Sequence, residues 1–184
     1  MKILQIARPL DRSFDPEGWK RLGSGGDKTG YLAPDKKSVV LVMKDLAKLA
    51  VPLAWYEFAK AQTSPHVIRV LDGPVHGTAD KDPVVMVRVE LLQPLKDPLI
   101  LGLHRGLYNV FYGKSAKLAG RTLRVEVNGK FKALTRHVLT EYPDYINVLV
   151  KCLEAAPAGA KFDAHSRNVM SRKGVPVVID PWIG

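Results

Sequence analysis

Two short apolar runs near the end of the sequence, residues 168–171 and 175–179, are separated by Arg172, Lys173 and Gly174. Short runs rich in valine and isoleucine predict strands, and a tight turn with glycine between them predicts a β-hairpin. A hairpin brings the residues before its first strand close to the residues after its second strand. This feature therefore determines which polar side chains near the end of the sequence can act together.

Three polar residues flank the two strands of this hairpin. Asn168 follows Asp163 by five residues, and Asp180 follows Asn168 by twelve, directly after the second apolar run. Phosphoryl transfer needs a carboxylate to accept the proton of the attacking hydroxyl, and oxygen ligands for Mg²⁺. Two carboxylates and one amide supply both. The alternative interpretation is that Asp163 and Asn168 are ordinary turn residues and that Asp180 begins a terminal turn.

The rest of the chain predicts an α+β fold made of short elements. Apolar runs with branched side chains predict strands at residues 38–44, 66–71 and 83–92. Helical spacing of apolar residues predicts helices at residues 46–62, with a break near Pro52, and at 142–156. A loop is predicted at residues 72–82 and a linker between two lobes at 93–98. Alternation predicts a strand at residues 121–127, with Asn128-Gly129 turning it toward 130–134.

In this order, the motifs resemble the protein-kinase-like superfamily. The resemblance is greatest to aminoglycoside and choline phosphotransferases and to small kinase-like proteins of bacteriophages, in which a D-x-H-x-x-N-V-M segment precedes an I-D-P or T-D-P strand. It implies a two-lobed fold with an N-lobe at residues 1–92 and a reduced C-lobe at 93–184. It also implies that Asp163 is the catalytic base and that Asn168 and Asp180 bind Mg²⁺.

The same resemblance assigns ATP binding to six residues, namely Gly23, Gly25, Lys44, Glu57, Glu90 and Leu92. The two glycines belong to the turn that covers the phosphates, and the lysine ends an apolar strand. The first glutamate lies on a predicted helix and is the expected partner of the lysine. Backbone groups of the last two residues are expected to bind adenine.

The sequence also departs from the family. Lys161 and Phe162 precede Asp163 where kinases have His-Arg or His-Gly, and Pro181 and Trp182 follow Asp180 in place of Phe-Gly. The sequence ends at Gly184, so we expect a truncated C-lobe without the helices that bind peptide substrates. Two interpretations follow: an ATP- and Mg²⁺-dependent phosphotransferase, and an inactive pseudokinase that binds a host protein or nucleic acid.

Basic residues are concentrated in the middle of the chain. The net charge is +10, and residues 101–140 contain eight basic residues against one acidic residue. We expect a polyanionic partner, a nucleic acid or an acidic host protein, bound through Arg121, Arg124, Lys130 and Lys132. The alternative is a solvated basic surface.

The single cysteine, Cys152, excludes an internal disulfide and fits a reducing compartment. No apolar run is long enough to predict a signal peptide or a membrane span. We therefore expect a cytoplasmic protein without membrane contact, in the host cytoplasm if a phage encodes it.

Overall fold

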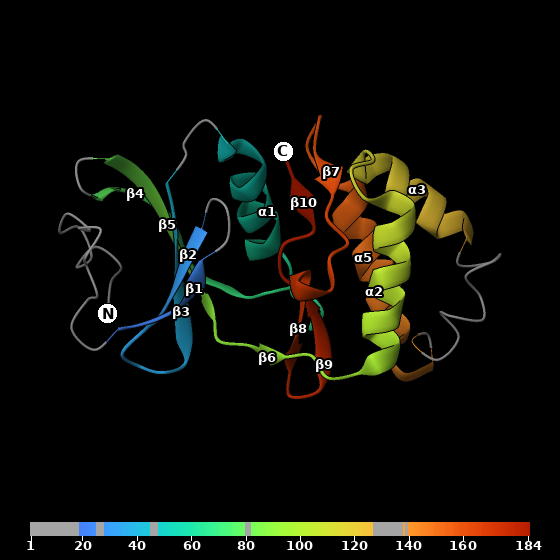
Figure 1. Ribbon diagram of the computed structural model, residues 1–184, viewed down its shortest axis with the longest axis horizontal. Coiled ribbons are helices and arrows are strands. Elements are labelled where there is room, and N and C mark those ends of the chain that lie inside the picture. The colour runs from blue at the N-terminus through green and yellow to red at the C-terminus, as the bar shows by residue number, and fades with distance from the viewer. Residues whose placement is uncertain (1–18, 25–27, 45–47, 80–81, 127–137, 139) are drawn as a thin grey trace. The chain divides into compact units, whose positions relative to one another are not determined.

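The computed structural model describes residues 19–184 apart from 25–27, 45–47, 80–81, 127–137 and 139. The chain divides into two compact units (Figure 1). Unit 1 contains the described residues up to Lys60 together with Arg69–Leu91, and unit 2 contains Ala61–Ile68 and the described residues of Leu92–Gly184. Both units combine helix with antiparallel strands, so the predicted α+β class is confirmed.

Unit 1 is a five-stranded antiparallel sheet with one helix. The strand order is β1-β2-β3-β5-β4. The strands are β1 (Lys20–Ser24), β2 (Lys28–Leu32), β3 (Ser38–Met43), β4 (Val70–Ala79) and β5 (Asp82–Glu90). The predicted strands at 38–44 and 83–92 are confirmed as β3 and β5, whose central side chains are mostly buried. The pairing of Val40 with Arg88 and of Val42 with Met86 fixes their register.

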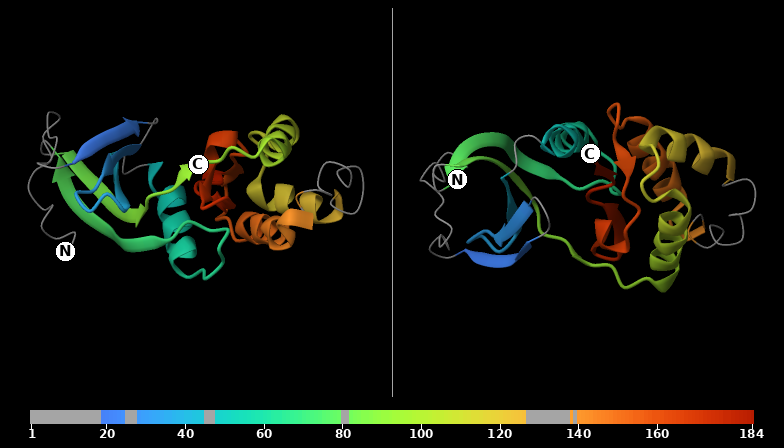
Figure 2. Two further views of the ribbon diagram at one scale, coloured as in Figure 1. Left: turned by 90° about the horizontal axis from the view of Figure 1, so that it is seen from below. Right: turned by 45° about the horizontal axis from the view of Figure 1, so that its top comes forward.

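Helix α1 (Ala50–Lys60) runs beside β4 (Figure 2). It buries Trp55, Tyr56 and Ala59. The predicted break near Pro52 does not occur, because this proline lies in the first turn, where a missing backbone N–H costs no helical hydrogen bond.

The loop predicted at residues 72–82 is wrong, since Val70–Ala79 forms strand β4. The strand is at the edge of the sheet, where glycine, proline and polar residues are tolerated because one side of the backbone makes no ladder. Gly73 has a φ of 90°, and a Cβ atom there would lie 2.8 Å from the carbonyl oxygen of Met86. The strand predicted at 66–71 is also wrong over most of its length: only Val67 makes an isolated bridge before β4 begins.

The described part of unit 2 combines helices with short strands, and Figure 1 shows the helices gathered on one side of those strands. The helices are α2 (Pro98–Phe111), α3 (Ala116–Glu126) and α5 (Pro143–Glu154), with a 3-10 helix, η3 (Ser166–Asn168). The strands are β6 (Gln93–Pro94), β7 (Lys161–Phe162), β8 (Val169–Arg172), β9 (Val175–Val178) and β10 (Trp182–Ile183). They form one sheet of order β6-β8-β9 and a separate β7–β10 pair.

The helix predicted at 142–156 is confirmed as α5, which buries Tyr145, Ile146 and Leu149 among others. The strand predicted at 121–127 is wrong, because residues up to Glu126 belong to α3. This helix buries small and apolar residues at helical spacing, namely Ala116, Ala119, Gly120 and Leu123. A Cβ atom on Gly120 would lie 3.0 Å from Cβ of Leu153, so the glycine permits close packing against α5. The predicted hairpin at 128–134 lies outside the described residues.

Candidate functional site

The predicted hairpin near the end of the sequence is present. Strands β8 and β9 pair antiparallel, with Val169 opposite Val178. Lys173 and Gly174 turn the chain with φ values of 52° and 91°, a conformation that favours glycine at the second position. One further backbone hydrogen bond extends the ladder, from the N–H of Ile179 to the carbonyl of Asn168 (3.0 Å).

A second short pairing lies next to the first. Strand β7 pairs with β10, with Phe162 opposite Trp182. The N–H of Asp163 then donates to the carbonyl of Pro181 (2.9 Å). Asp180 therefore lies between two anchored neighbours, Ile179 bonded to Asn168 and Pro181 bonded to Asp163.

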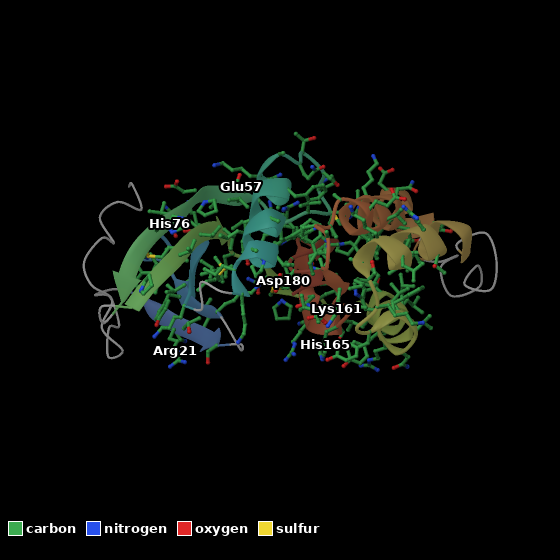
Figure 3. The ribbon with its side chains drawn as sticks, turned by 90° about the horizontal axis from the view of Figure 1, so that it is seen from above. Arg21, Glu57, His76, Lys161, His165 and Asp180 are labelled. Carbon is green, nitrogen blue, oxygen red and sulfur yellow. The ribbon has the colours of Figure 1, made fainter. Side chains whose placement is uncertain are left out.

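These bonds bring together the backbones of Asp163, Asn168 and Asp180, which we call the Asp-Asn-Asp cluster. The whole cluster belongs to unit 2. Figure 3 labels Asp180 together with Lys161 and His165, which come from β7 and the loop after it. The sequence therefore predicts correctly which three polar residues converge at this end of the hairpin.

Hydrogen bonds within the segment also order the loop between Asp163 and Asn168. Asn168 is buried, and its Nδ2 donates to the carbonyl of Asp163 (3.2 Å). The Oδ1 atom of Asp163 accepts from the N–H of His165 (3.3 Å), and the carbonyl of His165 accepts from the N–H of Asn168 (2.8 Å). The His165 ring accepts from the N–H of Arg167 and so caps η3. These hydrogen bonds fix the conformation of the loop and therefore the positions of its polar side chains.

The donor set of the Asp-Asn-Asp cluster fits Mg²⁺. Because Nδ2 of Asn168 donates to Asp163, the amide oxygen remains as the ligand-type atom of that side chain. Oδ1 of Asp180 is buried, and Asp163 is partly buried. Across the described parts of both units, no three His, Cys, Asp or Glu side chains group as a metal site. Two carboxylates and an amide suit Mg²⁺, which keeps several waters and uses few protein ligands when it binds with a nucleotide.

Two tyrosines, Tyr108 of α2 and Tyr112 at its end, lie close to the loop of the cluster, and no sequence pattern assigns them to this site. The ring of Tyr108 meets His165 edge-on, with centroids 5.6 Å apart, and is 4.6 Å from the ring of Tyr112. The pKa of Tyr108 is raised, first by desolvation and then by Tyr112 and the charge of Asp163. Both tyrosines are far from Asp163 in sequence, so no local pattern links them to it.

The predicted ATP-binding residues of unit 1 are only partly arranged as expected. Gly23 is exposed on β1, and Gly25 lies outside the described residues. Lys44 is exposed directly after β3. Glu57 lies on the exposed side of α1, and the described residues show no ion pair between it and Lys44. The cation that approaches α1 is instead Lys28 of β2, whose Nζ is 5.6 Å from the ring centroid of Tyr56.

The predicted adenine-binding segment has part of its backbone already bonded. The N–H of Glu90 donates to the carbonyl of Arg69 (3.1 Å), and its side chain accepts from the N–H of the same residue (2.8 Å). The N–H of Leu91 donates to the carbonyl of Lys37 (3.0 Å), and Leu92 is buried. A role of Glu90 in adenine binding would therefore rest on its carbonyl group.

The structure describes part of the basic segment, residues 101–140. Arg121 is exposed on α3, and Arg124 lies on the same helix, while Lys130 and Lys132 lie outside the described residues. Two further exposed lysines, Lys114 and Lys117, lie before and on α3. Large apolar side chains are exposed beside them in the sequence, with Tyr112 57% and Leu118 55% accessible.

No protein-family model matches this sequence, and no curated protein matches it. No helix in the described ranges is both long and apolar enough to cross a membrane. Neither comparison with known proteins assigns a family or a function to this chain.

Proposed function

We propose that this protein is an ATP- and Mg²⁺-dependent phosphotransferase with a protein-kinase-like fold. The observation that supports the proposal is the pair of backbone hydrogen bonds on either side of Asp180, which link this residue's neighbours to Asp163 and Asn168. Backbone bonds thereby hold together three residues that span 18 positions of the sequence, and we propose that their side chains act as one group of oxygen donors. This is the donor set that phosphoryl transfer uses.

Each residue of the cluster has a distinct proposed role. Asp163 accepts the proton of the acceptor hydroxyl as that oxygen attacks the γ-phosphate. Asn168 and Asp180 would hold Mg²⁺, which when bound neutralises charge on the phosphates. Lys44 is proposed to contribute its ammonium group to phosphate binding, and its exposure leaves that group accessible. The reaction forms an O–P bond to the acceptor, breaks the bond to the ADP oxygen, and leaves the proton on Asp163.

Thermal unfolding with and without nucleotide tests this proposal. A ligand present at 100 times its Kd stabilises the native protein by about 2.7 kcal/mol. We expect Mg·ATP to raise the Tm by the corresponding amount, while ATP with a chelator and Mg²⁺ alone leave it nearly unchanged. If Mg·ATP at millimolar concentration gave no shift, the proposed function would be wrong.

A second candidate function is supported by the surface of α2 and α3. Three basic side chains are exposed between the end of α2 and the middle of α3, namely Lys114, Lys117 and Arg121. Tyr112 and Leu118 are exposed in the same stretch of sequence. Basic and aromatic side chains together suit a single-stranded nucleic acid, because phosphates attract the cations and bases stack on rings. In this alternative the protein is an inactive pseudokinase that engages a nucleic acid or an acidic host protein. A cytoplasmic location, in the host if the gene is viral, belongs to both proposals.

A further inference from the structure

A buried histidine of α2 is bonded through both of its ring nitrogens. His104 is 2% exposed, and its Nε2 lies 2.5 Å from the hydroxyl of Tyr145 on α5. Its Nδ1 lies 3.4 Å from the carbonyl oxygen of Ala164. All three residues belong to unit 2, and Ala164 and Tyr145 are also fully buried.

The groups at the two ends of this series determine which atom donates and which accepts in each hydrogen bond. A backbone carbonyl can only accept, so Nδ1 of His104 carries the proton that bonds to Ala164. Nε2 is then the acceptor of the neutral ring, and the hydroxyl of Tyr145 donates to it. Burial raises the pKa of Tyr145 and lowers the pKa of His104 to about 4, so both side chains are neutral near pH 7.

The position of Ala164 shows why this series of hydrogen bonds matters. Ala164 lies between Asp163, the candidate base, and His165, whose backbone bonds to the Asp163 carboxylate. The N–H of Asp163 is anchored to Pro181 on the other side. The carbonyl of the Ala164–His165 peptide is therefore held directly by His104 of α2, and Tyr145 of α5 supports that histidine from its other ring nitrogen.

We propose that His104 is a positioning residue that fixes the backbone of the Asp163–Asn168 loop, with Tyr145 fixing the tautomer of His104. The catalytic consequence rests on the proposed function: with the loop fixed, the carboxylate of Asp163 is held ready for proton transfer. Sequence patterns do not reveal this role, because His104 is separated from Tyr145 by 41 residues and from Ala164 by 60.

Amide hydrogen exchange in three variants tests the role without relying on activity. His104→Leu removes both hydrogen bonds at similar volume, and His104→Asn keeps a donor near the position of Nδ1. Leu107→Ala is the matched control, because Leu107 is fully buried on the same helix and its truncation destabilises α2 without touching the loop bond.

We expect His104→Leu to speed exchange of the Asp163 and Asn168 amides by roughly fivefold or more relative to the amides of α5. His104→Asn should restore a large part of the protection, and Leu107→Ala should affect α5 and the loop to the same extent. If the loop responded equally in His104→Leu and Leu107→Ala, the inference would be overturned.

A kinetic measurement then separates this inference from the proposed function. If the wild type binds Mg·ATP and transfers phosphate, His104→Leu should lower kcat with little change in the KM for Mg·ATP, and His104→Asn should recover part of kcat. If the wild type has no activity, the proposed function fails while the exchange data still decide the role of His104. Unchanged kcat in an active His104→Leu variant would contradict the positioning role.

Discussion

The Asp163 carboxylate accepts a hydrogen bond from the backbone of His165, and this bond determines how its chemical role can be tested. Replacement by alanine would remove the acceptor and disturb the loop. Replacement by asparagine keeps an oxygen acceptor and removes only the basic charge. Asp163→Asn is therefore the more informative substitution.

We expect Asp163→Asn to bind Mg·ATP within about threefold of the wild type and to lose phosphate transfer by about 10²–10⁴-fold. A base acts on the proton in the transition state and contributes little to ground-state nucleotide affinity. Transfer of radiolabel from ATP to water, to the protein itself and to candidate acceptors measures the loss. Equal transfer by the variant and the wild type would exclude Asp163 as the base, and no transfer by either would favour the pseudokinase.

At the residue scale, the sequence predicts the convergence of Asn168 and Asp180 because they flank one local hairpin, and the neighbouring β7–β10 pairing brings Asp163 to the same place. The expected Lys44–Glu57 pair stays a prediction: both side chains are exposed, and helical spacing alone does not say which face of α1 is buried. It also misses His104, whose hydrogen-bond partners come from a different helix and a distant loop.

At the scale of elements, the His104–Tyr145 bond couples α2 to α5, and the burial of His104 predicts a pH dependence of the stability of unit 2. The groups bonded to the ring are the Tyr145 hydroxyl and the Ala164 carbonyl, and desolvation lowers the pKa of His104 to about 4. The unfolded chain binds this proton near pH 6.5. Between these values the unfolded state binds more protons than the folded state, so stability is lost as the pH falls from about 6.5 to 4.

We expect this single group to contribute up to roughly 3 kcal/mol of stability loss across that window, at about 1.36 kcal/mol per pH unit for one proton. Denaturant titrations of the wild type and His104→Asn at pH 7.5, 6, 5 and 4.5 measure it. The wild type should lose stability faster with acidification, so that the difference between the two proteins narrows. A constant difference at every pH would show that His104 does not titrate in this way.

Two elements show why local patterns are insufficient. Residues 121–126 alternate in polarity like a strand, but they belong to a helix whose buried Ala116, Ala119, Gly120 and Leu123 recur at helical spacing, and α3 packs on α5. Strand β4 has the polar, proline-containing sequence of a loop, and only its edge position in the sheet makes that sequence acceptable. In both cases contacts with the rest of the fold override the secondary structure that the local sequence favours.

At the scale of the whole molecule, the division into two units follows the predicted boundary in only one place. The break at Leu91–Leu92 lies beside the predicted linker, whereas residues 61–68 belong to unit 2. Val67 makes a parallel bridge to Val178, and the Arg172 guanidinium donates to the carbonyls of Pro65 and Val67. These contacts join positions more than 100 residues apart, which no local pattern reports.

The net charge of +10 leads to a prediction about nucleic-acid binding. Reversing Lys114, Lys117 and Arg121 to glutamate should weaken binding of a labelled single-stranded oligonucleotide and reduce the slope of log affinity against log salt by about 2, because fewer counterions are released. Reversing three exposed lysines of unit 1, Lys20, Lys36 and Lys37, is the matched control. Equal effects of the two sets would mean that the charge acts non-specifically.

The central claim, that the Asp-Asn-Asp cluster binds Mg²⁺ with ATP, is tested most directly by isothermal titration of the wild type, Asp180→Asn and Glu141→Gln. Glu141 is an exposed carboxylate of the same unit, so its substitution controls for the change in charge. We expect the wild type and Glu141→Gln to bind Mg·ATP equally, and Asp180→Asn to bind it at least about tenfold more weakly, a loss of about 1.4 kcal/mol. Unchanged affinity in a folded Asp180→Asn variant, or no binding by the wild type, would contradict the claim.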